Sequence, residues 1–225
     1  MRNFLFLLLA ILSPLSLLAQ PTAAPVMTYI DADGFETEET EYDGSAPLTA
    51  TFTAHISGAD GYTALCEWRF VKAGESAPFL TRFDEDTQYT FTQSGSYTVQ
   101  LLISFVQGAD TIEYVQDDPF TVNIRESRLE FPNAFTPNGD GINDIFKAKD
   151  GWQSIVSFHA QVFNRSGRLL YEWRDPAGGW DGRSGGRTVP DGAYYLRVDA
   201  RGADGHHYDI RKTINVLTGY REETR

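Results

Sequence analysis

Residues 94–105, SGSYTVQLLISF, carry an apolar side chain at every second position. The alternating residues, which follow the turn formed by Ser94 and Gly95, are Tyr97, Val99, Leu101, Ile103 and Phe105. A period of two, rich in aromatic and β-branched residues, is typical of a strand with one buried and one solvated face. We therefore predict a long β-strand here, with these five side chains in a core.

The same alternation recurs on both sides of this stretch. In the first half it runs through Leu48, Ala50, Phe52, Ala54 and Ile56, and again through Cys66, Trp68 and Phe70. In the second half it covers residues 156–162, 169–173, 194–200 and 208–216. Glycine-containing turns at 58–61, 108–110, 164–167 and 203–205 separate the runs, and none of the runs has a helical period. The sequence predicts an all-β fold of two antiparallel β-sandwich-like modules.

Charge divides the chain into two parts. The net charge is −12 over 225 residues. Residues 31–118 contain 17 acidic side chains and three basic ones, whereas residues 126–225 contain 14 of each sign. Such a change indicates two modules with different surfaces. We predict a β-sandwich over 44–125 and a second module over 126–225. Neither has the dense basic face that nucleic acid requires, so we expect no nucleic-acid partner.

The first 19 residues have the composition of a signal peptide. Arg2 supplies a positive charge, residues 4–12 form a short apolar core, and Ala19 provides a small residue before Gln20. We expect cleavage near Gln20. Later segments are too short or too polar to form a membrane-spanning helix, so we expect no transmembrane segment in the mature chain. Residues 20–43 include the acidic run ETEETE and are predicted to be a solvated leader.

Four ordered motifs in the last hundred residues resemble one family. They are FPNAFTPNGDGINDIF at 131–146, VFNRSGRLLYEW at 162–173, WDGR at 180–183 and VPDGAYYLRV at 189–198. In this order they resemble the gliding-motility-associated C-terminal domain, the type B sorting domain of the type IX secretion system. The resemblance implies export across both membranes to the cell surface or the extracellular space. It also implies recognition by the type IX outer-membrane translocon and an accessory outer-membrane barrel protein.

The first module is similar to a polycystic-kidney-disease (PKD) type domain. The similarity rests on APLTATFTA at 46–54, CEWRF at 66–70 and SGSYTVQLLI at 94–103. That family usually continues its tryptophan strand into a Gly-Asp-Gly turn, whereas VKAGES follows Phe70 here. Such domains generally serve as spacers or weak binding modules.

Residues 138–144, NGDGIND, allow two interpretations. Asn-Gly and Asp-Gly pairs favour a tight turn, because glycine takes positive φ and the polar side chains bond to the backbone. The alternative is a calcium site formed by oxygen ligands from Asn138, Asp140, Asn143 and Asp144. The loop does not fit an EF-hand, since Ile142 and Lys149 occupy ligand positions of that template. We favour the turn and expect no other cofactor.

The remaining reactive residues do not form a recognisable catalytic motif. Residues 182–186 match G-x-S-x-G, but neither an apolar strand precedes them nor a helix follows. The four histidines lack metal-ligand spacing, and the acidic runs at 84–86 and 117–118 are predicted to be charged loops. Cys66, the only cysteine, is predicted to be a buried thiol. The aromatic residues Trp152, Trp173, Trp180, Tyr194 and Tyr195 favour core positions, with a carbohydrate-stacking platform as the alternative.

These observations together favour a secreted, non-enzymatic protein. In this interpretation the C-terminal module is a sorting signal, and the PKD-like module is a spacer or a binding module for a glycan or protein. Two alternatives are a surface adhesin or glycan-binding protein and a structural component of a surface machinery.

Overall fold

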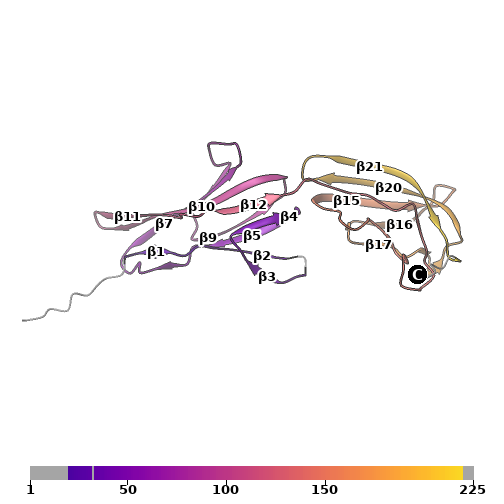
Figure 1. Ribbon diagram of the computed structural model, residues 1–225, viewed down its shortest axis with the longest axis horizontal. Coiled ribbons are helices and arrows are strands. Elements are labelled where there is room, and N and C mark those ends of the chain that lie inside the picture. Colours follow the sequence, from indigo (N-terminus) through magenta and orange to yellow (C-terminus); the bar gives the residue numbers. More distant parts are fainter. Residues whose placement is uncertain (1–19, 32, 220–225) are drawn as a thin grey trace, which may run out of the picture.

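The structure is a computed structural model that describes residues 20–31 and 33–219. All regular elements of this part are β-strands, and they form two β modules placed end to end (Figure 1). The predicted all-β class is confirmed. The expected signal peptide, residues 1–19, lies outside the described residues.

The first module contains two sheets that face each other. One sheet has the order β4 (Glu41–Gly44), β12 (Phe120–Ile124), β10 (Gly95–Gln107), β7 (Thr63–Lys72) and β8 (Leu80–Arg82). In the same sheet β11 (Asp110–Val115) pairs with the C-terminal half of β10. The other has the order β3 (Glu36–Glu38), β2 (Val26–Ile30), β5 (Leu48–Thr53) and β9 (Asp86–Phe91). A small pair, β1 (Thr22–Ala23) and β6 (Ile56–Ser57), flanks them.

Aromatic side chains from both sheets fill the core between them. Phe52 on β5 has its ring centroid 5.8 Å from Trp68, 5.5 Å from Phe70 and 5.7 Å from Phe120, all on the opposite sheet. All four side chains are fully or almost fully buried. The alternating residues of 94–105 face this core as predicted, because β10 places every second side chain inward.

Residues 20–43 differ from the predicted solvated leader. They contain β1, β2, β3 and most of β4, which pair with the sheets of the first module. Met27 on β2 is fully buried. The acidic run was misleading because β3 and β4 lie at sheet edges, where alternate charged side chains remain in water while the backbone pairs.

The C-terminal module is built on one five-stranded sheet. Its order is β13 (Ala134–Phe135), β21 (His207–Val216), β20 (Gly192–Gly202), β15 (Ile155–Phe163) and β16 (Leu169–Trp173). Its core contains Leu129, Phe131 and Trp180 beside the inward residues of the long strands. Two short pairs complete the module: β14 (Phe146–Lys147) with β17 (Gly179–Trp180), and β18 (Arg183–Ser184) with β19 (Arg187–Thr188).

Two strand pairs depart from the predicted antiparallel arrangement. β4 runs parallel to β12, and β13 runs parallel to β21. Both are short edge strands that reach their partners through long connections, so hairpin geometry does not constrain their direction. All other strand pairs within the described residues are antiparallel.

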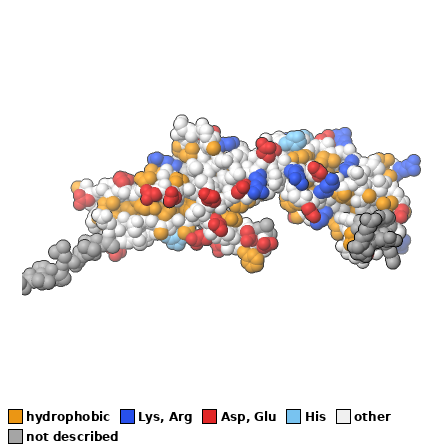
Figure 2. Space-filling model, viewed as in Figure 1, with side chains coloured by type: hydrophobic (Ala, Val, Ile, Leu, Met, Phe, Trp, Pro, Cys, Tyr) orange, Lys and Arg blue, Asp and Glu red, His pale blue; other side chains and the backbone are white. Residues whose placement is uncertain are grey.

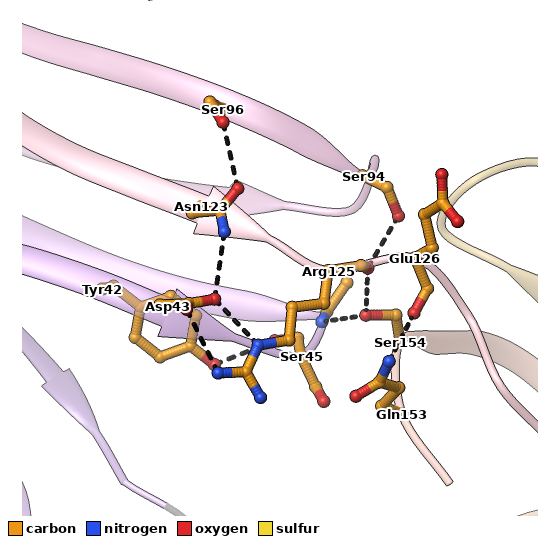
Figure 3. Close-up of polar contacts among 11 residues, drawn as sticks. Tyr42, Asp43, Ser45, Ser94, Ser96, Asn123, Arg125, Glu126, Gln153 and Ser154 are labelled. Atoms are coloured by element: carbon orange, nitrogen blue, oxygen red, sulfur yellow. Dashed lines mark hydrogen bonds and ion pairs between the residues drawn. The ribbon is translucent and has the colours of Figure 1, made fainter.

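The modules meet at a hydrogen-bonded junction around Arg125 (Figure 3). The buried Ser154 hydroxyl donates to the Arg125 carbonyl at 2.6 Å and accepts from the Ala46 N–H at 3.2 Å. The Ser94 hydroxyl donates to the same carbonyl at 2.8 Å, and its backbone N–H donates to the Ala203 carbonyl at 3.0 Å. Ala203, in the turn between β20 and β21, belongs to the core of the first module. The second module therefore completes the packing of the first.

Charge follows the same division on the surface. Figure 2 shows acidic side chains along the first module, and most of the visible Lys and Arg side chains on the second. At the junction, Arg125 forms a two-pronged ion pair with Asp43, with N–O distances of 2.8 and 3.1 Å. The pair lowers the pKa of the Asp43 carboxyl, chiefly through the hydrogen bond from Arg125. Both partners belong to the first module and both side chains are more than half exposed, so we expect this pair to add little to stability.

Candidate functional site at the distal end of the C-terminal module

The loop 138–144 is a tight turn held by its own side chains. The Asn138 side-chain carbonyl accepts from the Asp140 N–H at 3.0 Å, and Asp140 accepts from the Ile142 N–H at 2.9 Å. Gly139 and Gly141 have φ of 81° and 86°, and Asn143 has φ of 53°. These conformations account for the Asn-Gly, Asp-Gly and Asn-Asp pairs of the motif.

Asp144 is the centre of this turn. Its two carboxylate oxygens accept from the Gly139 N–H at 2.6 Å and from the Gly141 N–H at 2.7 Å. These bonds, that from Gly139 first, lower the pKa of the Asp144 carboxyl. Within the described residues there is no group of three His, Cys, Asp or Glu side chains that could hold a metal. The geometry is that of a turn, and the calcium alternative at Asn138, Asp140, Asn143 and Asp144 stays a prediction for experiment.

The WDGR motif packs against the base of this loop. Gly182 has φ of 72°, and a Cβ atom built on it would lie 2.8 Å from Pro137 and 3.3 Å from Phe135. Trp180 is fully buried, with its ring 5.4 Å from Phe135, and its indole N–H donates to the Arg183 carbonyl at 2.8 Å. Glycine is required at 182 because the first motif passes directly over it.

The VPDG motif binds the end of the chain that the structure describes. The Asp191 carboxylate accepts from both the Thr218 N–H at 2.8 Å and the Thr218 hydroxyl at 2.5 Å. These bonds lower the pKa of Asp191, that from the hydroxyl first. The Tyr194 hydroxyl donates to the Pro190 carbonyl at 2.8 Å. The motifs are separate in the sequence, and their convergence in space is not predictable from it because it depends on the pairing of β13 with β21.

We call this set of contacts the distal cluster. It comprises the loop 136–145, residues 180–191 and residues 217–219, and it lies at the end of the module opposite the junction (Figure 1). The hairpin turn at 164–168 lies at the same end of the sheet, because β15 ends opposite the start of β20. In this turn the Asn164 side chain accepts from the Ser166 and Arg168 N–H groups. Gly167 has φ of 80°, in agreement with the predicted turn.

Strand β21 presents a largely unpaired edge beside this cluster. β13 pairs only with Asn215 and Val216, so the outer edge from His207 to Ile214 has no strand partner among residues 20–31 and 33–219. The Asn215 N–H donates outward to Asn133 and the Leu217 N–H outward to Phe135. Since backbone N–H groups alternate in direction along a strand, the N–H of Thr213 also points to this outer side.

The other sequence-level candidates do not converge on a reactive site. The G-x-S-x-G match at 182–186 forms the β18–β19 hairpin, in which Gly185 and Gly186 have positive φ. His159 and His207 pair separately with Glu172 at 2.9 Å and Asp199 at 3.2 Å. The runs 84–86 and 117–118 lie in loops or at a strand start, as expected.

Buried and exposed aromatic residues separate clearly. Trp173, Trp180 and Tyr194 are buried in the second core, whereas Tyr195 is 45% exposed on the open face of the sheet. Trp152 is half-buried next to the junction. Cys66 is buried, and burial raises the pKa of its thiol, as expected for a structural cysteine.

Comparison with protein families identifies the C-terminal module. Residues 129–214 match the CHU_C Type IX secretion signal domain. This match covers the five-stranded sheet except the last two residues of β21, and it covers the distal cluster except residues 217–219. A signal domain of this kind implies export. The protein is therefore exported to the cell surface or the extracellular space and handled by the type IX secretion machinery.

The other comparisons add little. No curated protein matches the chain. A solved structure described as the tetra-tandem repeat in the extending region of a large adhesion protein aligns over 89% of this chain and 68% of that chain. Its identity is 11% and its TM-score 0.26, values too low to transfer a function. The comparisons identify no catalytic family, and the described residues contain no helix that could cross a bilayer.

Proposed function

We propose that the distal cluster and the outer edge of β21 together form the surface that the type IX outer-membrane translocon and an accessory outer-membrane barrel protein recognise. The convergence of the family motifs beside an unpaired strand edge is the observation that carries this proposal. The first module is then the part of the protein that the sorting module exports, a PKD-like spacer or binding module without catalytic activity.

A free strand edge is a physical means of recognition. An extended segment of a receptor can pair with the unpaired N–H and C=O groups of such an edge, while the side chains around it provide specificity. On β21 the outer groups of residues 207–214 have no strand partner among residues 20–31 and 33–219, and we infer that a receptor segment pairs with them. The distal cluster holds the end of the strand in place, since Asp191 binds Thr218 and β13 pairs with Asn215 and Val216.

The assignment of the first module rests on its core. Trp68 lies fully buried on β7, against Phe52 of the facing sheet. Where the PKD pattern has a Gly-Asp-Gly turn, β7 ends in a turn at Gly74 with φ of 88°. A sandwich of this kind separates the sorting module from a partner without needing a reactive site, which favours a spacer or binding role.

A reporter fusion tests the sorting function. Residues 126–225 are placed behind a signal peptide and a folded reporter, in a host with a type IX translocon and in the same host without it. We expect the reporter outside the cell only when the translocon is present. Removal of the full-length protein's residues from 208 onward should leave it in the periplasm. Normal export of that truncation, or translocon-independent release of the reporter, would refute the proposal.

A point variant separates edge pairing from folding. Thr213→Pro removes one outward N–H while leaving the hydrogen bonds between β20 and β21, because proline is tolerated on the solvent side of an edge strand. We expect a folded protein with reduced export. Thr213→Val keeps the N–H and should be exported normally. Equal export of both variants would show that backbone pairing at this edge is not the recognition step.

A further inference from the structure

A cleft of about 480 Å³ lies between the two modules, next to the junction. In the first module its walls come from residues 30–31 at the end of β2 and from residues 42 and 45–49 around the β4–β5 connection. In the second module they come from Trp152, Ile155 and residues 175–176. Figure 2 shows the corresponding notch between the modules. Its volume lies within the range of about 300–1,000 Å³ that small-molecule sites occupy.

The lining combines flat apolar surfaces with hydrogen-bonding oxygens. Trp152 and Tyr42 are both half-buried, so part of each ring remains accessible, and Pro47 and Pro176 extend the apolar surface. The oxygens come from the carboxylates of Asp31 and Asp175 and from the hydroxyls of Ser45 and Thr49. Lys, Arg and His are absent from the described residues that line the cleft. An anionic ligand would therefore find no counter-charge here.

The two carboxylates are held in place on opposite walls. One oxygen of Asp31 accepts from the N–H groups of Asp33 and Phe35, both at 2.9 Å, and the other accepts from the Thr37 hydroxyl at 3.3 Å. One oxygen of Asp175 accepts from the Ala177 N–H at 2.9 Å. Asp31 thus keeps capacity for about one further hydrogen bond, whereas Asp175 keeps most of its acceptor capacity. Both carboxylates can accept hydrogen bonds from the hydroxyl groups of a ligand.

We propose that this cleft binds a neutral carbohydrate, with the Trp152 and Tyr42 rings contacting the C–H face of a sugar and the Asp31 and Asp175 carboxylates accepting hydrogen bonds from its hydroxyls. A sugar ring presents both kinds of surface, and a carboxylate is a strong acceptor for a hydroxyl donor. The inference deepens the proposed function and rests on it, because it gives the exported first module a ligand. Both modules contribute to the site, so the junction is what creates it.

Trp152 provides a direct measurement of binding. The chain has four tryptophans, of which Trp68 and Trp180 are fully buried and Trp173 is 7% exposed. Acrylamide quenching of the secreted protein's fluorescence therefore reports chiefly on Trp152. The probes are soluble neutral hexasaccharides of β-1,4-glucose, α-1,4-glucose, β-1,3-glucose, β-1,4-xylose and α-1,6-mannose. We expect at least one to protect Trp152 from quenching, with the affinity confirmed by calorimetry.

Three variants locate the site. Trp152→Ala should weaken the affinity about tenfold or more, the loss expected for one aromatic contact with its buried area. Asp175→Lys changes an exposed loop residue and removes its bond from the Ala177 N–H, so it should lower the melting temperature only slightly while also weakening binding. Tyr195→Ala removes an exposed aromatic ring on the open sheet face, far from the cleft, and should bind as the unaltered protein does.

Each other result overturns the proposal. Absence of binding by all five sugars at millimolar concentration refutes it, as does binding that Asp175→Lys leaves intact. Hexalysine that binds in place of the sugars and depends on Trp152 would assign the cleft to a cationic peptide instead. Export of the Trp152→Ala protein is measured separately in cells, so failure of sugar binding is distinguishable from failure of the sorting function.

Discussion

Replacing Ser154 by alanine should loosen the junction between the modules. The variant removes the hydroxyl that donates to Arg125 and accepts from the Ala46 N–H. The Arg125 carbonyl keeps its bond from Ser94, whereas the buried Ala46 N–H loses its side-chain acceptor. An unpaired buried donor costs about 1–3 kcal/mol. Alanine is preferred to glycine for this test because φ at 154 is 51°, and glycine would relieve that conformation and mask the loss.

The expected readout is a lower melting temperature of the full chain. For a protein of this size each kcal/mol shifts the midpoint by about 2–4 °C, so scanning calorimetry should resolve the change. Ser94→Ala is the matched control, because it removes the other bond to the same carbonyl at a site that water reaches. Its effect should stay within about 0.5 kcal/mol. A melting temperature of Ser154→Ala equal to that of the unaltered protein, or a larger loss in Ser94→Ala, would show that this reasoning about the junction is wrong.

Three further predictions concern the distal cluster. Exchanging Asp140 and Asp144 together for Asn should lower the melting temperature, and neither calcium nor chelator should shift that of the unaltered protein; a large calcium-dependent rise that the double variant abolishes would establish the metal site. Because the folded-state pKa of Asp144 is lowered, its carboxylate stabilises the fold above the unfolded pKa of about 3.9, and this stability is lost as pH falls through the folded value. The melting temperature of Asp144→Asn should therefore be lower than that of the unaltered protein at pH 6 and approach it in acid, as thermal melts across pH can test. Gly182→Ala should destabilise the module by at least about 1 kcal/mol, since a Cβ would be strained by positive φ and would meet Pro137 and Phe135; an unchanged denaturation midpoint would contradict that contact.

The long strands were predictable because their signal is local. In β10 and β20 every second residue is buried, and this period is visible within a single stretch of sequence. The turn at 164–167 was predictable for the same reason, since the Asn164 side chain and the positive φ of Gly167 act within five residues.

The short edge strands were not predictable, because their partners are distant in sequence. β4 has few apolar residues and pairs with β12 about 80 residues later, so its own composition resembles that of a solvated loop. The cleft beside Trp152 was missed for a related reason. It exists only through the relative placement of two modules, which no sequence period encodes. The sequence favoured a core position for Trp152, and the structure leaves it half-buried beside the open cleft.

The position of Ala203 has a consequence for the order in which the protein matures. This residue packs into the first core, yet it lies 79 positions after Ile124, the last strand residue of that module. A chain made from its N-terminus thus presents nearly all of the first sandwich before the residue that closes it. The first module can therefore pack completely only when most of the C-terminal sorting module has been made. Early folding intermediates and finished molecules then differ at the surface where the two modules join.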